Sequence, residues 1–152
     1  MKILIVSQHF WPENFQINFI SRLLSKQNDV DVLTGIPNYP DGKFFKGYNF
    51  FKISSEKFYN INIYRVPLFP RFKNRFSLFL NYISFCFFAA LIGPFLLRKK
   101  KYDVIFVYGV SPILQILPAI VLSFLKKTPI ILWVQDLWPE TVIEVLNIKS
   151  KI

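Results

Sequence analysis

The residues best suited to chemistry stand where apolar runs of the chain end. Gln135 and Asp136 directly follow the apolar run 130–134 and precede Trp138 and Pro139. A β-branched run without polar alternation is typical of a parallel strand that is buried on both faces. In open α/β sheets the carboxyl ends of the strands border the crevice where ligands bind. We therefore expect Gln135 and Asp136 at a ligand site, although an aspartate that only caps the following helix would need no such role.

A second polar group follows the first predicted strand, residues 2–7. Asn14 is the expected N-cap of a helix over 15–27, and a strand over 30–34 completes a β-α-β unit with parallel strands. Glu13 is a candidate ligand contact, or else a first-turn acid that complements the helix dipole. No glycine precedes residue 35, so both the G-x-G-x-x-G fingerprint and the P-loop are missing from this turn. An enzyme that binds a nicotinamide or flavin cofactor through that fingerprint is therefore not expected.

The loop after the second strand, residues 35–48, holds three of the five glycines and two prolines. It should be a long ordered loop at the same carboxyl edge. Asn38 and Tyr39 are its candidate ligand contacts, and a simple connector is the alternative. Two further strands are expected over 50–54 and 61–66, on either side of a turn.

Residues 76–97 contain no charged side chain, and this length matches the apolar thickness of a bilayer. Strands of one sheet are expected both before and after the segment, which argues against a membrane crossing. We expect a helix that packs on the sheet and places its outer face in the membrane interface, with a fully buried helix or a true span as alternatives. The candidate interface residues are Arg71, Lys73, Arg75, Phe79, Arg98, Lys99 and Lys100.

The remaining elements complete the expected fold. A strand over 103–108 should lead to a helix that Ser111 and Pro112 open and Pro118 kinks, and the strand over 130–134 follows. The pattern predicts a single α/β domain over residues 1–152, a Rossmann-like parallel sheet flanked by helices.

Composition restricts the partners. The net charge of +10 favours an anionic partner, and 53% hydrophobic residues with 18 Phe exceed the needs of an ordinary core.

The sequence also argues against several kinds of site. Cys86 is the only cysteine and should be a buried apolar residue, and His9 is the only histidine, so no metal site is expected. Nucleic-acid binding would rest on charge alone and is not expected. The first residues lack the long apolar region of a secretory signal.

Three stretches, residues 6–14 (VSQHFWPEN), 33–43 (LTGIPNYPDGK) and 133–140 (WVQDLWPE), resemble the amino-terminal half of family 4 glycosyltransferases. The chain is most similar to bacterial enzymes of O-antigen and capsule assembly, particularly L-fucosamine transferase-like proteins. Two departures stand out. Many members have a Gly-Gly pair where this chain has Asn14 and Phe15, and many have a histidine at the strand end that here carries Gln135 and Asp136.

The resemblance implies one half of a GT-B fold, in which this domain holds mainly the acceptor. The second domain, which holds most of the nucleotide sugar, expected to be UDP-linked, is absent from these 152 residues. Transfer would retain the anomeric configuration without a cofactor or bound metal. Asp136 would orient the acceptor or stabilise positive charge that develops on the sugar. The implied acceptor or donor contacts are Glu13, Asn14, Phe15, Asn38, Tyr39, Ser111 and Gln135.

The expected function is the acceptor-side domain of a membrane-associated glycosyltransferase that extends a polyprenyl-diphosphate-linked oligosaccharide. Such a protein would be cytoplasmic, on the inner face of the bacterial cytoplasmic membrane. This chain alone should have negligible transferase activity, because both reactants must be held together for catalysis. The alternatives are a non-catalytic membrane-recruitment subunit and an inactive truncated product, each of which needs a separate donor-binding chain.

Overall fold

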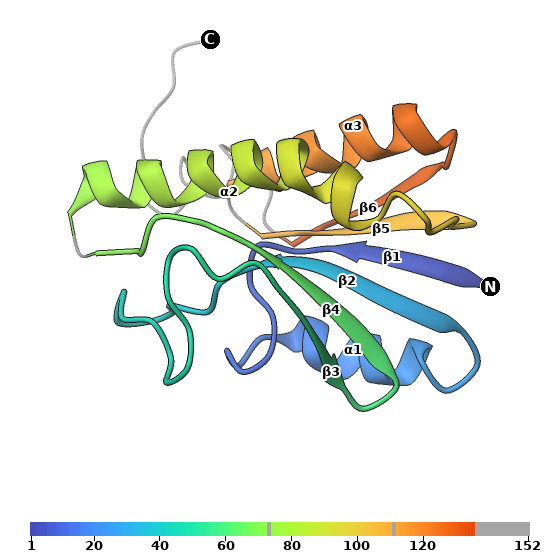
Figure 1. The fold of residues 1–152 in the computed structure, drawn as a ribbon, viewed down its shortest axis with the longest axis horizontal. Coiled ribbons are helices and arrows are strands. Elements are labelled where there is room, and N and C mark those ends of the chain that lie inside the picture. Colours follow the sequence, from blue (N-terminus) through green and yellow to red (C-terminus); the bar gives the residue numbers. More distant parts are fainter. Residues whose placement is uncertain (73, 111, 136–152) are drawn as a thin grey trace, which may run out of the picture.

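A computed structural model describes residues 1–72, 74–110 and 112–135. One six-stranded sheet runs through the molecule in the order β3-β4-β2-β1-β5-β6 (Figure 1). All its neighbouring strands are parallel except β3, which pairs antiparallel with β4 at one edge. The Rossmann-like α/β fold is therefore confirmed. The strands are β1 (Lys2–Val6), β2 (Asp29–Gly35), β3 (Ser54–Phe58), β4 (Ile61–Val66), β5 (Val104–Gly109) and β6 (Ile130–Val134).

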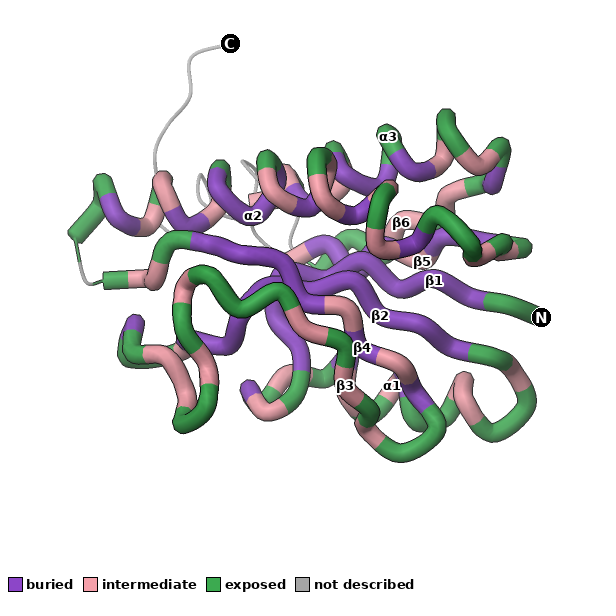
Figure 2. Tube along the Cα trace, in the orientation of Figure 1, coloured by how far each residue is buried: buried purple, intermediate pink, exposed green. Residues whose placement is uncertain are grey.

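Helices cover both faces of the sheet (Figure 1). Helix α1 (Gln16–Leu24) lies on one face, while α2 (Arg75–Leu96) and α3 (Ile116–Lys126) lie side by side on the other, after the short 3-10 turn η1 (Ile113–Gln115). Successive side chains of β1 point to opposite faces, so Leu4 joins the core under α2 and α3 while Ile5 joins the core against α1. The central strand is thus buried on both sides (Figure 2).

The core under α2 and α3 includes Cys86, as expected for an apolar cysteine. Burial raises the pKa of its thiol to about 11, so the sulfur stays protonated at neutral pH. On the sheet, Gly35 lies so close to Leu68 that a Cβ added at Gly35 would come within 2.1 Å of the Leu68 side chain. A glycine at the end of β2 therefore lets the segment after β4 pack directly against the strand.

Strand β6 differs from the expectation of a strand buried on both faces. It is the outermost strand, and its side chains alternate: Ile130 and Leu132 pack on the core under α3, whereas Ile131 and Trp133 are exposed. On the exposed side Trp133 contacts the rings of Phe106 and Tyr108 on the neighbouring strand β5, yet it remains 39% exposed because β6 is an edge strand. Its all-apolar sequence does not by itself mean burial on both sides.

Several helix and strand ends also differ from those predicted from the sequence. Helix α1 begins at Gln16 with Phe15 as its N-cap, not Asn14, and no side chain caps it. The strand expected over 50–54 lies later in the chain, because β3 runs from Ser54 to Phe58. Pro118 does not kink a helix. It stands in the first turn of α3, where its missing N–H would have had no partner within the helix.

Candidate functional site

The loops that leave the carboxyl ends of the strands are joined by buried amide side chains. The backbone N–H of Gln8, just after β1, donates to Oε1 of Gln115 at 2.8 Å. The Gln8 side chain donates from Nε2 to Oδ1 of Asn81 at 2.6 Å. All three residues are buried. The end of β1 is therefore tied to both α2 and η1. Sequence analysis missed this group, although an amide such as Asn81 within a charge-free helix was a signal.

Glu13 connects the first two loops of this edge. Its side chain is buried, with 2% of the residue exposed. Oε1 accepts hydrogen bonds from the backbone N–H groups of Asn38 and Tyr39, each at 2.7 Å, and Oε2 lies 2.9 Å from Nδ1 of His9. Both carboxylate oxygens are thus occupied by the protein. Glu13 precedes α1, so it is not a first-turn acid, and in this structure it positions the loops.

Three rings, those of His9, Phe15 and Tyr39, pack together beside the Glu13 carboxylate. The His9 ring stacks on Phe15 with centroids 4.7 Å apart and planes 3° apart, and Tyr39 packs on both rings. Phe15 and Tyr39 are half-buried and Asn14 is exposed, so these three candidates remain accessible at the surface. His9 was not predicted as a site residue. Its spacing of four from Glu13 in a loop was the signal that could have identified the pair.

Asn38 fixes the loop after β2 against the segment that leads into α2. Its Oδ1 accepts from the backbone N–H of Arg71 at 2.8 Å, and its Nδ2 donates to the carbonyl of Ile36 at 2.9 Å. The residue is almost fully buried. Asn38 therefore acts within the protein as a positioning residue, while its half-buried neighbour Tyr39 packs its ring on His9 and Phe15.

Arg65 at the end of β4 is a buried cation that sequence analysis missed. Its Nε donates to Oε1 of Glu56 at 2.6 Å, and its two terminal nitrogens donate to the carbonyls of Gly35 and Trp11. Burial alone would raise the pKa of Glu56, but hydrogen bonds from Tyr48 and Arg65 outweigh burial and hold that pKa below its usual value. Arg65 thus connects the loops after β1 and β2 to the edge hairpin.

Gln135 is the last described residue and lies where β6 ends. Its backbone N–H donates to the carbonyl of Gly109 at 2.9 Å, and its exposed side chain accepts from the Tyr108 hydroxyl at 3.3 Å. This places Gln135 at the carboxyl edge, as predicted. The candidates Lys73, Ser111 and Asp136 lie outside the described residues.

The candidate membrane residues divide into three places. Phe79 and Arg75 are exposed on α2, and Arg98 and Lys99 are exposed just past its far end. Lys100 is half-buried and pairs with Asp31 at 3.3 Å. Arg71 lies apart from them, against the ring of Tyr39 at the carboxyl edge.

Residues along the outer faces of α2 and α3 are exposed (Figure 2), and many of them are apolar. Within the described ranges, α2 is the one helix long and apolar enough to cross a membrane, and 39% of its most apolar window is buried. Part of the helix therefore serves the core and part faces outward. The exposed apolar side chains on the two helices are Phe76, Phe79, Ile83, Phe87, Leu91, Phe95, Leu117, Ile120, Val121, Phe124 and Leu125.

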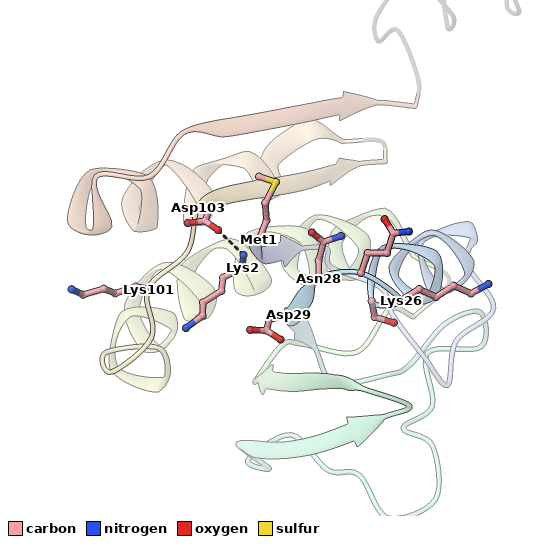
Figure 3. Close-up of a pocket in the computed structure, with 9 residues that line it drawn as sticks. Met1, Lys2, Lys26, Asn28, Asp29, Lys101 and Asp103 are labelled. Atoms are coloured by element: carbon pink, nitrogen blue, oxygen red, sulfur yellow. Dashed lines mark hydrogen bonds between the residues drawn. The ribbon is translucent and has the colours of Figure 1, made fainter.

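A wide surface hollow lies at the opposite, amino edge of the sheet (Figure 3). It has a volume of about 780 Å³ and is open and polar, and the backbone N–H of Lys2 donates to Asp103 across it at 2.7 Å. The side chains of Lys26 and Lys101 point away from each other at its ends (Figure 3). None of the sequence-predicted ligand contacts that the structure describes lines this hollow.

In the part of the chain that the structure describes, no three His, Cys, Asp or Glu side chains are grouped so that they could hold a metal ion. Comparison with known proteins adds no assignment: no protein-family model matches the chain, and no curated protein matches its sequence. Function is therefore inferred from the residues and geometry of the carboxyl edge.

Proposed function

We propose that this chain is the acceptor-side domain of a retaining glycosyltransferase that acts on a lipid-linked oligosaccharide at the bacterial inner membrane. The main support for the proposal is that a polar surface and an apolar surface lie next to each other. The polar loops at the carboxyl edge lie beside the start of α2, whose outer face is apolar from Phe76 to Phe95. A substrate with a polar glycan and a polyprenyl tail needs both kinds of surface next to each other.

The accessible groups of this edge suit sugar binding. Tyr39 and Phe15 offer aromatic faces, and the exposed amides of Asn14 and Gln135 can donate to and accept from hydroxyl groups. Asp136 would follow directly as the carboxylate that orients the acceptor or stabilises developing positive charge. A nucleotide sugar would be held mainly by a second domain or partner chain, so the 152 residues alone should transfer sugar at a negligible rate.

Vesicle binding tests the membrane part of the proposal with a matched pair of variants. Phe87 on α2 and Phe19 on α1 are similarly exposed, 59% and 62%, but they lie on opposite faces of the sheet. Removing one phenylalanine from an apolar contact costs about 2 kcal/mol, so Phe87→Gln should weaken binding to anionic vesicles by at least about tenfold. Phe19→Gln should bind like the wild type. Equal binding by all three proteins would contradict a membrane contact through α2.

The acceptor part is tested by adding a polyprenyl-diphosphate-linked sugar to those vesicles. The lipid-linked sugar should increase binding of the full chain, whereas a UDP-sugar in solution should bind weakly. Tight binding of the UDP-sugar without any response to the lipid-linked sugar would mean that the chain is not the acceptor side.

A further inference from the structure

A small pocket opens at the carboxyl edge between the loop after β2 and the segment that leads into α2. It is lined by Tyr39, Pro40, Arg71, Phe72 and Leu78 and has a volume of about 310 Å³. Its wall combines one cation with aromatic and aliphatic surface. None of its described lining residues is acidic.

The cation in this pocket is held in place from several sides. The Arg71 guanidinium lies over the Tyr39 ring, 5.0 Å from its centroid, and the Arg71 backbone N–H donates to Asn38. Gly42 packs against the Arg71 carbonyl so closely that a Cβ at Gly42 would lie 2.0 Å from that oxygen. Since Glu13 fixes the backbone of Tyr39 in turn, the whole arrangement is attached to the buried network of the site.

The charge of Arg71 is not neutralised by any residue that the structure describes. Among the described residues, no carboxylate forms an ion pair with its guanidinium, and no side chain or carbonyl accepts a hydrogen bond from it. Arg65 is the contrast, because three of its nitrogens donate to protein acceptors. A guanidinium that stacks on a ring still has its N–H edges available for an anion, and phosphate oxygens fit that planar fork.

We propose that this pocket binds a phosphate or diphosphate group through the Arg71 guanidinium, with Tyr39 holding the guanidinium in position. Phe72 and Leu78 are beside the group, and the exposed rings of Phe76 and Phe79 continue the apolar surface along α2. This path suits a diphosphate that carries a lipid tail. That the diphosphate belongs to a lipid rests on the proposed function. A soluble diphosphate would offer the same phosphate oxygens to the Arg71 guanidinium.

The first experiment titrates the full chain with inorganic pyrophosphate in a calorimeter at fixed ionic strength. The Arg71→Gln variant lacks the bidentate, charge-assisted contact, so it should bind pyrophosphate at least about tenfold more weakly than the wild type. Arg22→Gln is the matched control, because the Arg22 guanidinium also lies over a tyrosine ring, Tyr59, at 4.1 Å but on α1. The control should bind within about twofold of the wild type. An equal loss in both variants, or no binding by the wild type, would overturn the proposal.

Two further variants separate the fork from simple charge and from misfolding. Arg71→Lys keeps the charge without the planar fork and should bind pyrophosphate more weakly than the wild type but better than Arg71→Gln. Tyr39→Leu keeps the cation and removes the ring beneath it, so a few-fold loss is expected. Thermal unfolding of each variant checks that the chain is folded. Wild-type affinity in a folded Arg71→Gln protein would contradict the proposal.

The second experiment identifies the source of the phosphate. Uncharged phosphatidylcholine vesicles with and without a polyprenyl diphosphate are compared, and the diphosphate should increase binding of the wild type but not of Arg71→Gln. Arg71-dependent binding of pyrophosphate without a vesicle response would support the site with a soluble ligand, and would count against the lipid acceptor of the proposed function. A vesicle response that is the same in Arg71→Gln would keep that function and refute this pocket.

Discussion

The two edges of the same sheet are built differently. At the carboxyl edge, side chains such as Gln8, Glu13 and Asn38 are buried and bonded to one another or to backbone groups. At the amino edge, the large hollow is lined mainly by charged and polar residues, and Lys2, Lys26 and Lys101 are exposed. Size alone would favour the amino edge as a site, whereas fixed polar geometry favours the carboxyl edge.

The fold holds polar side chains in fixed positions at the carboxyl edge rather than at the amino edge. A buried polar group destabilises the folded state unless it is hydrogen-bonded, and no described buried side-chain nitrogen or oxygen lacks a partner. Exposed lysines need no such arrangement, because water solvates them. A network that holds loops in one geometry is what a ligand site requires, so substitutions at the two edges should differ in their effects.

The largest expected effect is at Arg65, which joins three segments at the carboxyl edge. Arg65→Leu leaves the carbonyls of Gly35 and Trp11 without their donor and leaves Glu56 without its ion-pair partner. Because Arg65 is fully buried, the loss of these three contacts together should lower the free energy of unfolding by about 3 kcal/mol. Urea unfolding followed by circular dichroism measures this value, and a loss below about 1 kcal/mol would contradict the assigned role.

Glu13 should follow, because two buried N–H groups depend on its carboxylate. Glu13→Ala removes the acceptor of both Asn38 and Tyr39 and should reduce the free energy of unfolding by about 2 kcal/mol. Glu13→Gln is the matched control, since its amide oxygen can still accept from both groups. Equal destabilisation by the two variants would show that the two N–H bonds are not the source of the stability.

Glu56 should make a smaller, pH-dependent contribution. Its folded-state pKa is lowered, so the unfolded chain binds more protons and the contribution is present above the ordinary glutamate pKa of 4.5. It is lost as the pH falls through the lower folded-state value. Because Glu56 is partly exposed, about 1 kcal/mol or less is expected. Urea unfolding between about pH 6 and pH 3 should show a weaker pH dependence for Glu56→Gln than for the wild type. An unchanged dependence would contradict the ion-pair role.

The smallest effect belongs to the amino edge. Lys101 is exposed beside the large hollow, and Lys101→Gln should change the free energy of unfolding by no more than about 0.5 kcal/mol. It should also leave pyrophosphate binding unchanged within error. A loss of stability or binding comparable with that of the carboxyl-edge variants would remove the contrast between the two edges.

The sequence predicted the fold well because its signals are local. Apolar runs and turn residues identified β1, β2, β4, β5 and α2, and the expected edge for Gln135 was right. The strand over 50–54 and the N-cap at Asn14 were wrong, since propensity does not fix element ends. The exposure of one face of β6 depends on which helix covers which strand, and that is a tertiary property.

The contacts of several candidate site residues could not be predicted from the sequence. Glu13 and Asn38 were expected to touch a ligand, yet their polar atoms are occupied within the protein. Arg71 was assigned to the membrane flank because it precedes an apolar helix, whereas the fold stacks it on Tyr39. Such pairings join residues distant in the chain, and neither spacing nor composition encodes them.

Hydrogen–deuterium exchange of the full chain on nanodiscs, with and without a polyprenyl-diphosphate-linked sugar, can locate the edge of the sheet that binds the lipid-linked sugar. The account predicts that the sugar lipid slows exchange in residues 36–42 and 67–79, around the Arg71 pocket and the start of α2. The amino-edge residues 26–29 and 99–103 should exchange as they do on the empty nanodiscs. Slower exchange confined to the amino edge would contradict the assignment of the carboxyl edge as the functional one.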